Sequence, residues 1–364
     1  MVWTQSPRKI VCLGDSITGA YYHTGSRRAY PEMLKIALEK AYKCSEIEVI
    51  NAGLNGDNTL GGLERLESDV LSHKPDLVTI NFGMNDCTHL PIEEYHANIV
   101  ELVTKCGNTG AKVVLCTPTG VIDSPERPQD RLAVYAQEIR FVAKEMNVPM
   151  ADLHKTWEGL RLIDNTAYER IMSDNFHPNM EGHKLIAQTI VNVVSGKTVS
   201  LKDVKPLGGA LSFTFELLKM GKPIKVIAMP PYDGLIGEAL KQISPNSLVQ
   251  VTTWPVEGMD LEAIAKWAEG VREMHPNLVI LALPATATGS EINYVRIMNL
   301  SLSFGPAEWD YFAITPSVAS QAVHDREEIM KGFIAAQDIP LIERKCGDKR
   351  PALELLVDWI KRQA

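Results

Sequence analysis

Long hydrophobic runs are missing from this sequence of 364 residues. No apolar stretch approaches the ~20 residues that a membrane-spanning helix needs, so we expect no membrane span. Residues 1–10 are polar and contain no apolar core of a signal peptide. We therefore expect a cytoplasmic protein, with secretion after removal of a leader as the alternative.

Basic residues are fewer than acidic ones: the chain has 37 Lys and Arg residues and 45 Asp and Glu residues, which gives a formal net charge of −8. No run of Lys or Arg interrupts this mildly acidic background. Nucleic acids and anionic membrane surfaces attract proteins through basic patches. The composition therefore predicts neither of them as a partner.

Cysteine is sparse as well: the six cysteines are scattered and form no Cys-x-x-Cys pair. Cys12 and Cys116 lie inside apolar runs and are expected in the core. This usage favours a reducing compartment over a disulfide framework. The spacing of His177 and His183 does not match a metal-ligand motif, so we expect no metal and no organic cofactor.

Segments of strand length alternate with segments of helical periodicity through the first half of the chain. Strands are expected at 9–13, 47–50, 77–82, 112–116 and 148–153, and helices at 30–42, 60–71, 93–105, 131–145 and 181–194. Strands that are separated by helices form βαβ units, which give a parallel sheet covered by helices on both faces. The predicted fold is an α/β/α sandwich of three layers around a central parallel sheet.

A polar stretch with Gly and Pro at 195–209 marks a domain boundary, so we predict a first domain over 1–197 and a second over 206–364. The second half resembles the first in the same order: 225–229 resembles 9–13, 251–258 resembles 49–56, 276–281 resembles 75–80, 314–316 resembles 116–118, and 339–341 resembles 148–150. We interpret it as a second α/β domain of similar type. A chance likeness between two α/β halves is the alternative.

A serine on a tight turn follows the first expected strand, in the segment GDSITG at 14–19. There Ser16 would project its hydroxyl from the carboxyl edge of the sheet, where open α/β sheets place their ligands. A serine nucleophile needs a general base, and His177, which precedes the last helix, can accept its proton. Asp174 can fix the imidazole tautomer. Ser16, Asp174 and His177 are therefore the candidate catalytic residues.

Hydrogen-bond donors are expected at the same edge of the sheet. The segments NAGLNG at 51–56 and GMND at 83–86 follow the second and third strands. The backbone N–H of Gly53, the side-chain amide of Asn85 and the N–H of Ser16 could stabilise a developing oxyanion. Each segment alone has a structural alternative, since Gly-Asp-Ser is common in turns, Asp174 could cap the last helix and His177 could be a surface histidine.

Together, GDSITG, NAGLNG, GMND and DNFHP resemble the four sequence blocks of the SGNH (GDSL-type) hydrolase superfamily, over about residues 8–194. The resemblance implies a flavodoxin-like SGNH fold and a serine esterase with Ser16 as nucleophile, Asp174 and His177 as partners, and Ser16, Gly53 and Asn85 as the oxyanion hole. We expect short-acyl (acetyl) esters of carbohydrates as substrates, whether small molecules or oligosaccharides. A lysophospholipase or thioesterase, or a carbohydrate-binding protein without activity, are the alternatives.

Several polar residues near these blocks have two interpretations. Asp15 is expected to accept a hydrogen bond in the turn rather than act as a second base. Asp86 and Cys87 could line the site or be structural, and Asp57 and Asn58 could touch the substrate. His89 and His96 are expected on the surface or in loops.

The second half lacks the residues of the site. Our alignment places Pro231 opposite Ser16, Pro255 opposite Gly53 and Thr286 opposite Asn85. Proline has no N–H to donate, so Pro255 cannot replace the Gly53 donor. We predict a degenerate, non-catalytic SGNH-like domain that binds part of the substrate, caps the site or mediates assembly, and we make no prediction of the oligomeric state.

Overall fold

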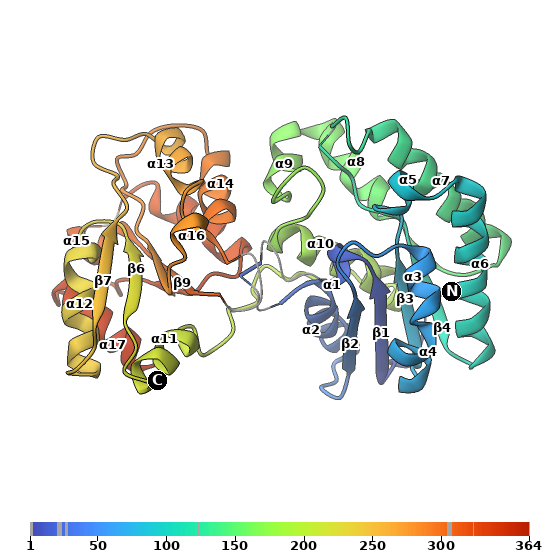
Figure 1. The fold of residues 1–364 in the computed structure, drawn as a ribbon, viewed down its shortest axis with the longest axis horizontal. Helices are drawn as coiled ribbons and strands as arrows, with labels where there is room; N and C mark the ends of the chain where they lie inside the picture. Colours follow the sequence, from blue (N-terminus) through green and yellow to red (C-terminus); the bar gives the residue numbers. More distant parts are fainter. Residues whose placement is uncertain are drawn as a thin grey trace. The chain divides into compact units, whose positions relative to one another are not determined.

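The computed structural model describes residues 3–19, 24–25, 28–122, 124–303, 308–322 and 324–363 (Figure 1). The chain forms two compact units, one of residues 1–20 and 28–203, the other of residues 21–27 and 204–364. The first unit thus extends through most of the polar stretch in which we expected the boundary. Leu201 is fully buried, and the Lys40 ammonium lies 2.5 Å from the Asp203 carboxylate.

Five parallel strands form the first sheet, in the order β2-β1-β3-β4-β5. They are β1 (Lys9–Gly14), β2 (Glu48–Gly53), β3 (Leu77–Asn81), β4 (Lys112–Cys116) and β5 (Met150–Ala151). The inner strands β1, β3 and β4 are almost wholly buried, and they read as short apolar runs because helices cover both faces of the sheet. Cys12 and Cys116 are buried here, as predicted.

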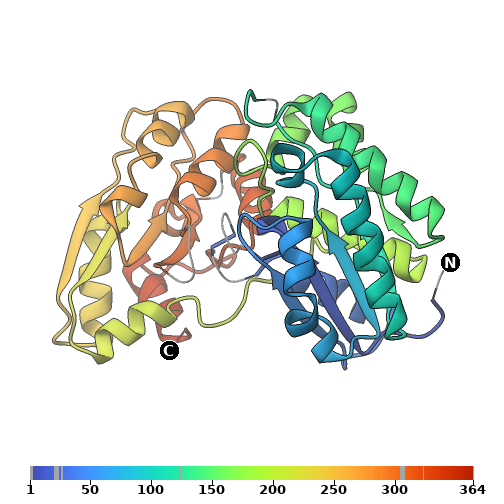
Figure 2. The same ribbon diagram turned by 45° about the vertical axis from the view of Figure 1, so that its right-hand side comes forward.

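Helices lie on both faces of this sheet (Figures 1 and 2). On one face α2 (Tyr30–Tyr42) packs against α10 (Met180–Ser195). On the other, α6 (Ile92–Asn108) lies between α3 (Thr59–Glu64) and α7 (Gln129–Glu145). Right-handed crossovers put the connection from β1 to β2 on the opposite face from the later ones, because the strand order reverses direction after β2.

The predicted elements of the first domain are present with two corrections. The helix expected at 60–71 is divided into α3, α4 (Leu66–Asp69) and a 3₁₀ turn at Leu71–His73. Two adjacent glycines, Gly61 and Gly62, weaken the helix at its start. The expected strand at 148–153 is only two residues long, because Asp152 already caps the next helix by accepting a hydrogen bond from the Lys155 N–H.

Four short helices of the first domain were not predicted. Two of them, α1 (Ser16–Gly19) and α5 (Asp86–His89), directly follow β1 and the loop after β3. The other two, α8 (Leu153–Ile163) and α9 (Asn165–Arg170), lie between β5 and the segment that contains His177. Among the described residues, no helix is both long and apolar enough to span a membrane.

The second sheet repeats the topology of the first. Its strands are β6 (Ile224–Ala228), β7 (Val249–Thr253), β8 (Leu278–Leu281), β9 (Asp310–Ile314) and β10 (Leu341–Ile342), in the order β10-β9-β8-β6-β7. This is the order of the first sheet read from the other edge. Both domains therefore have the predicted α/β fold with a parallel sheet of five strands.

The register of the two sheets also agrees with the sequence alignment of the two halves. In the first sheet Ile10 pairs with Val49 and with Leu77. In the second sheet the residues aligned with these three pair in the same way: Val226 pairs with Val251 and with Leu278. The register also makes one correction, because it places Tyr232, rather than Pro231, opposite Ser16. Both Ser16 and Tyr232 begin the helix that follows the first strand of their domain.

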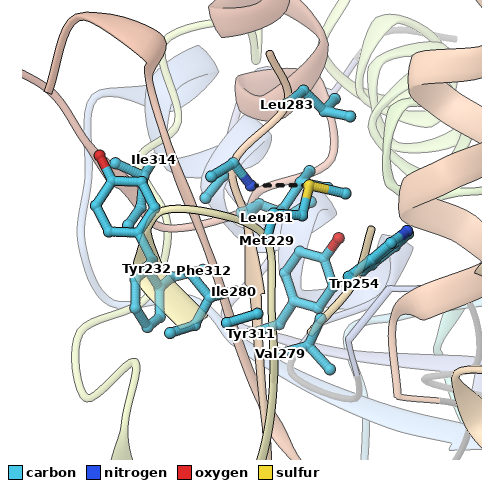
Figure 3. Packing of buried hydrophobic residues seen from close by; sticks show 14 of the residues in the cluster. Met229, Tyr232, Trp254, Val279, Ile280, Leu281, Leu283, Tyr311, Phe312 and Ile314 are labelled. Carbon is cyan, nitrogen blue, oxygen red and sulfur yellow. Dashed lines mark hydrogen bonds between the residues drawn. The ribbon is translucent and has the colours of Figure 1, made fainter. Parts of the chain in front are cut away.

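The second domain has a hydrophobic core of its own (Figure 3). Met229 lies at the centre of this packing, and its sulfur accepts a hydrogen bond of 3.2 Å from the Ala282 N–H. Trp254 is fully buried and its ring stacks on Trp267 at 5.0 Å. The helices around the sheet are α11 (Ser212–Lys219), α12 (Tyr232–Ile243), α13 (Leu261–Ala268), α14 (Ile292–Ser301), α15 (Pro316–Ser320), α16 (Glu327–Ala336) and α17 (Ala352–Lys361).

Candidate active site

Ser16 is the first residue of α1 and comes two positions after the end of β1. The preceding Asp15 holds the turn: its carboxylate accepts a hydrogen bond of 2.9 Å from the Ile17 N–H, and its carbonyl accepts one of 2.9 Å from the Gly19 N–H. Asp15 therefore acts as the cap of a single helical turn, which agrees with its interpretation as a turn residue. Ser16 is 9% exposed and thus largely buried.

The structure brings Ser16, His177 and Asp174 together in one hydrogen-bonded chain. Ser16 Oγ lies 3.0 Å from His177 Nε2, and His177 Nδ1 lies 2.8 Å from Asp174 Oδ2. A carboxylate can only accept, so the hydrogen-bond network assigns the imidazole proton to Nδ1. Nε2 is then an acceptor that faces the serine hydroxyl.

A compact loop fixes Asp174 relative to His177. The second carboxylate oxygen, Asp174 Oδ1, accepts the N–H groups of Phe176 at 2.9 Å and of His177 at 2.7 Å. Burial opposes ionisation of this carboxyl, but the hydrogen bond and the charge interaction with His177, together with these two N–H groups, hold its pKa well below the ordinary value. Asp174 is therefore an anion at neutral pH.

The amide of Asn85 is held at both ends. Its Nδ2 donates to the Asp57 carbonyl at 2.8 Å, and its Oδ1 accepts from Arg127 Nη2 at 2.8 Å. Arginine only donates and a carbonyl only accepts, so these partners leave no ambiguity between the amide oxygen and nitrogen. The nitrogen carries a second hydrogen, which remains for another acceptor.

The other two expected donors differ from each other. Among the described residues no acceptor bonds the Ser16 N–H, which lies at the start of α1. The Gly53 N–H instead donates to Asn51 Oδ1 at 3.0 Å, while Asn51 Nδ2 donates to the Thr18 carbonyl at 2.9 Å. A substrate oxyanion at Gly53 would have to share this N–H with Asn51.

A close backbone contact joins the first two blocks of the site. A Cβ atom added to Gly53 would lie 2.1 Å from the Gly19 nitrogen, and one added to Gly19 would lie 2.2 Å from the Gly53 carbonyl oxygen. Neither position has room for a larger residue, because the atoms in the way belong to the backbone. Glycine at both positions thus brings the turn of Ser16 against the end of β2.

Two arginines that hold the site together have no signal in the sequence. The Arg65 guanidinium donates to the carbonyl of Ala52 at 2.7 Å, to the carbonyl of Gly14 at 3.0 Å and to the carboxylate of Asp57 at 2.8 Å. Arg127 contacts Asn85 as described above. Neither arginine belongs to a motif, and each finds its partners only in the folded chain.

Most of the other polar residues of these blocks are structural. Asp57 pairs with Arg65, and Asn58 caps α3. Asp86 is fully buried and accepts from the N–H and hydroxyl of Thr59 and from the Gly83 N–H. Cys87 is buried and its thiol donates to the Met84 carbonyl.

His89, His96 and His183 lie at surface or structural positions. His89 is exposed, and His96 is partly exposed with Nδ1 2.7 Å from the Glu138 carboxylate. His183 is buried and its Nδ1 accepts from the Tyr30 N–H at 3.1 Å. No group of three or more His, Cys, Asp or Glu residues able to hold a metal ion occurs in the described part of the chain.

The buried Asp15 carboxyl makes the stability of the protein depend on pH. Burial, and then the negative charges of Asp86 and Asp57, raise the pKa of Asp15 to about 7 against the pull of Arg127. An unfolded chain ionises this group near pH 4. Between about pH 4 and pH 7 the folded state therefore binds the extra proton, and stability falls as the pH rises.

We expect Asp15→Asn to remove this dependence while keeping an acceptor for the Ile17 N–H. The free energy of unfolding of the wild type should fall relative to that of the variant by about 1.4 kcal/mol per pH unit between about pH 4 and pH 7. Urea denaturation of both proteins across this range measures the difference. Parallel curves would mean that the Asp15 carboxyl ionises at an ordinary pH.

The fold and the site together define the general class of the protein. A serine, a histidine and an aspartate meet in one hydrogen-bonded chain at the carboxyl edge of a parallel sheet, in the same domain as the fixed amide of Asn85. This is the arrangement expected of a hydrolase.

Comparison with known proteins gives the family. Residues 12–185 match the sequence profile of the GDSL-like Lipase/Acylhydrolase family. An acetylxylan esterase of Geobacillus stearothermophilus is 26% identical over 212 residues, which cover 52% of this chain and 94% of that protein. An arylesterase of Vibrio mimicus is 33% identical over 113 residues, which cover 31% of this chain and 55% of that protein. A crystal structure of a lipase/acylhydrolase from Enterococcus faecalis aligns at 33% identity and a TM-score of 0.47, over 53% of this chain and 99% of its own.

The first domain therefore belongs to the GDSL-like Lipase/Acylhydrolase family, as its four sequence blocks predicted. The protein is a carboxylic ester hydrolase.

Proposed function

We propose that this protein hydrolyses esters through a covalent acyl-enzyme on Ser16, with His177 as general base and Asp174 as its orienting partner. The observation that carries the proposal is the chain from Ser16 Oγ to His177 Nε2 at 3.0 Å and from His177 Nδ1 to Asp174 Oδ2 at 2.8 Å. His177 takes the hydroxyl proton as Ser16 attacks the ester carbonyl. The resulting imidazolium is stabilised by the Asp174 anion.

The second half of the reaction uses the same groups in the reverse direction. Acylation is complete when His177 gives its proton to the leaving alcohol and the tetrahedral intermediate collapses to the acyl-enzyme. In deacylation His177 removes a proton from water as the water attacks the acyl-enzyme, and it returns this proton to Ser16 Oγ as the acid is released. The oxyanion of both steps lies against the Ser16 N–H and the remaining Asn85 N–H, and it shares the Gly53 N–H with Asn51 as three-centre bonds do.

Asn85→Ala tests the oxyanion assignment. We expect kcat for a p-nitrophenyl ester to fall by about 10²- to 10³-fold, with a small change of KM, because the lost hydrogen bond forms fully only in the transition state. Steady-state kinetics measure both constants. Asn108→Ala removes the same amide from an exposed position at the end of α6 and should leave kcat unchanged. An effect of Asn85→Ala on KM alone would assign Asn85 to binding of the ground state.

For the substrate we propose a short-acyl ester, an acetyl group on a carbohydrate. The support comes from the acetylxylan esterase of Geobacillus stearothermophilus, of which this chain covers 94%. A second acetylxylan esterase, of Xylanibacter ruminicola, is 25% identical over 214 residues that make up 43% of that protein. The lipid and thioester alternatives predict a different dependence on acyl length.

A series of p-nitrophenyl esters of increasing chain length tests this proposal. We expect kcat/KM to be highest for acetyl and to fall for octanoyl and longer acyl groups, because a short-acyl site offers no room for the added carbons. Acetylated xylo-oligosaccharides should be deacetylated as well. A specificity constant that rises with each methylene, each worth up to ~0.8 kcal/mol when buried, would instead indicate an apolar acyl channel and a lipid or thioester substrate.

We also propose that the second domain has no catalytic centre. Counted from the aligned strands, Tyr232, Pro255 and Thr286 take the places of Ser16, Gly53 and Asn85. Tyr232 is 2% exposed, and its hydroxyl has no hydrogen-bond partner among the described residues. Proline offers no N–H for an oxyanion.

A further inference from the structure

One guanidinium group connects the two loops on which the proposed chemistry depends. Arg127 lies between β4 and α7, two residues before the start of α7. Its Nη2 donates to Asn85 Oδ1 at 2.8 Å, and its Nε donates to the Met84 carbonyl at 3.2 Å. The same group lies 4.0 Å from the centre of the Phe176 ring, and that ring lies 4.3 Å from the imidazole of His177.

The first of these contacts acts on the oxyanion donor. With Oδ1 bonded to Arg127 and one Nδ2 hydrogen bonded to the Asp57 carbonyl, the Asn85 amide cannot rotate. The direction of its remaining N–H is therefore fixed before substrate binds. A donor that is already oriented can stabilise an oxyanion without a rearrangement of the site during the reaction. A cation bonded to the amide oxygen also withdraws electron density from the amide and makes this N–H a stronger donor.

The second contact acts on the loop of the base. Phe176 directly precedes His177, and both of their N–H groups donate to Asp174 Oδ1. A guanidinium over the face of an aromatic ring attracts it through the ring quadrupole. Arg127 thus restrains the Phe176 side chain, which is next to His177 in the chain.

We propose that Arg127 is a positioning residue that orients and polarises the Asn85 amide and, through Phe176, ties the loop of His177 to it. The inference rests on the proposed function, since it acts on the proposed oxyanion donor. It assigns no contact between Arg127 and substrate. The role requires both the charge and the planar fork of arginine, because one group must donate to Asn85 and Met84 and stack on Phe176 at once.

The expected signature is a loss of kcat that depends on Asn85. We expect Arg127→Ala to lower kcat for p-nitrophenyl acetate about 10- to 100-fold with little change of KM, less than the loss of the donor itself. The double variant with Asn85→Ala should lose clearly less than the two single losses multiplied together, because the effect of Arg127 on the Asn85 amide is already gone and only the restraint on the loop of His177 is left to lose. Arg127→Lys, which keeps the charge but loses the fork, should lie between the wild type and Arg127→Ala. Arg161→Ala on α8, where the arginine pairs with Glu158, is the matched control and should keep the wild-type kcat.

Three results would overturn the inference: an unchanged kcat in Arg127→Ala, an effect confined to KM, or an effect that adds in full to that of Asn85→Ala. If Arg127→Ala does not fold, Arg127→Lys is compared with the wild type, with Asn85→Ala and with the double variant in its place. The same three results would then overturn the inference. Labelling of the wild type at Ser16 by a fluorophosphonate separates this inference from the proposed function. A labelled, active wild type with an unaffected Arg127→Ala would refute only the role of Arg127, whereas an unlabelled Ser16 would refute the proposed function.

Discussion

Ser16→Ala should abolish ester hydrolysis and leave the free energy of unfolding close to that of the wild type. Only one oxygen atom is removed, and its hydrogen-bond partner is His177 Nε2, so we expect little change in packing. Because Ser16 is the proposed nucleophile, we expect kcat to fall by about 10⁴- to 10⁶-fold. Steady-state hydrolysis of p-nitrophenyl acetate and urea denaturation measure the two effects.

Labelling by a fluorophosphonate probe makes the same experiment more specific. The wild type should be labelled at Ser16 alone, and the full-length Ser16→Ala protein should not be labelled anywhere. Ser72→Ala, which removes a hydroxyl from an exposed turn, serves as the control and should be labelled like the wild type. Residual labelling of Ser16→Ala within 204–364 would contradict a non-catalytic second domain. Retention of most of the activity would contradict the nucleophile itself.

The elements that could be predicted from the sequence are those whose pattern is set by local burial. The strands β1, β3 and β4 are buried on both faces, so each reads as an apolar run between polar turns. The edge strand β5 pairs through only Met150 and Ala151, too few residues to give a pattern. The helix α8 has a helical pattern, with Leu153 and Trp157 one turn apart and both buried, and the prediction overlooked it. The helix α9 has six residues, too few to show a periodicity.

The repeat of the fold could be predicted because the strands keep their register in both halves. The error at Ser16 lies in the turn that follows the first strand, where Pro231 assumes a deletion of one residue. The alignment of 225–229 with 9–13, continued without a gap, places Tyr232 opposite Ser16, and both residues begin the helix that follows. An alignment between repeats is thus most accurate inside the strands and least accurate in the loops that follow them, where the candidate site residues lie.

The candidate site divides in the same way. Ser16 and Asn85 stand in short motifs after β1 and β3, and Asp174 and His177 stand in a short motif before α10, so residue type and place together predict a role for each. Arg127 is 42 positions from its partner Asn85, and Arg65 is 51 positions from its partner Gly14. An arginine that bonds carbonyl and amide oxygens far along the chain belongs to no local sequence pattern. The meeting of Ser16, Asp174 and His177 could therefore be predicted, whereas the arginines that hold the surrounding loops could not.

Asp174→Asn should lower kcat by about 10⁴-fold while KM changes little, because it alters the direction of a hydrogen bond rather than the shape of the site. The Asp174 carboxylate can only accept, and it therefore keeps the proton of His177 on Nδ1. An asparagine keeps an oxygen for the N–H groups of Phe176 and His177 and turns its NH₂ group toward Nδ1. The imidazole then carries its proton on Nε2 and donates to Ser16 instead of accepting from it. Steady-state kinetics on p-nitrophenyl acetate measure this loss.

The control for this change lies ten positions earlier in the chain. Asp164 is exposed and caps α9, where its carboxylate accepts from the Thr166 N–H at 2.8 Å. Asparagine caps helices as well as aspartate does, so Asp164→Asn should keep full activity and stability. The depressed pKa of Asp174 also stabilises the folded wild type above about pH 4, and this stabilisation is lost as the pH falls through the lower pKa of the folded state. Asp174→Asn should lack this pH-dependent stabilisation. A kcat within tenfold of the wild type would show that the tautomer of His177 is set by groups other than Asp174, and the anion would then stabilise the fold of the loop alone.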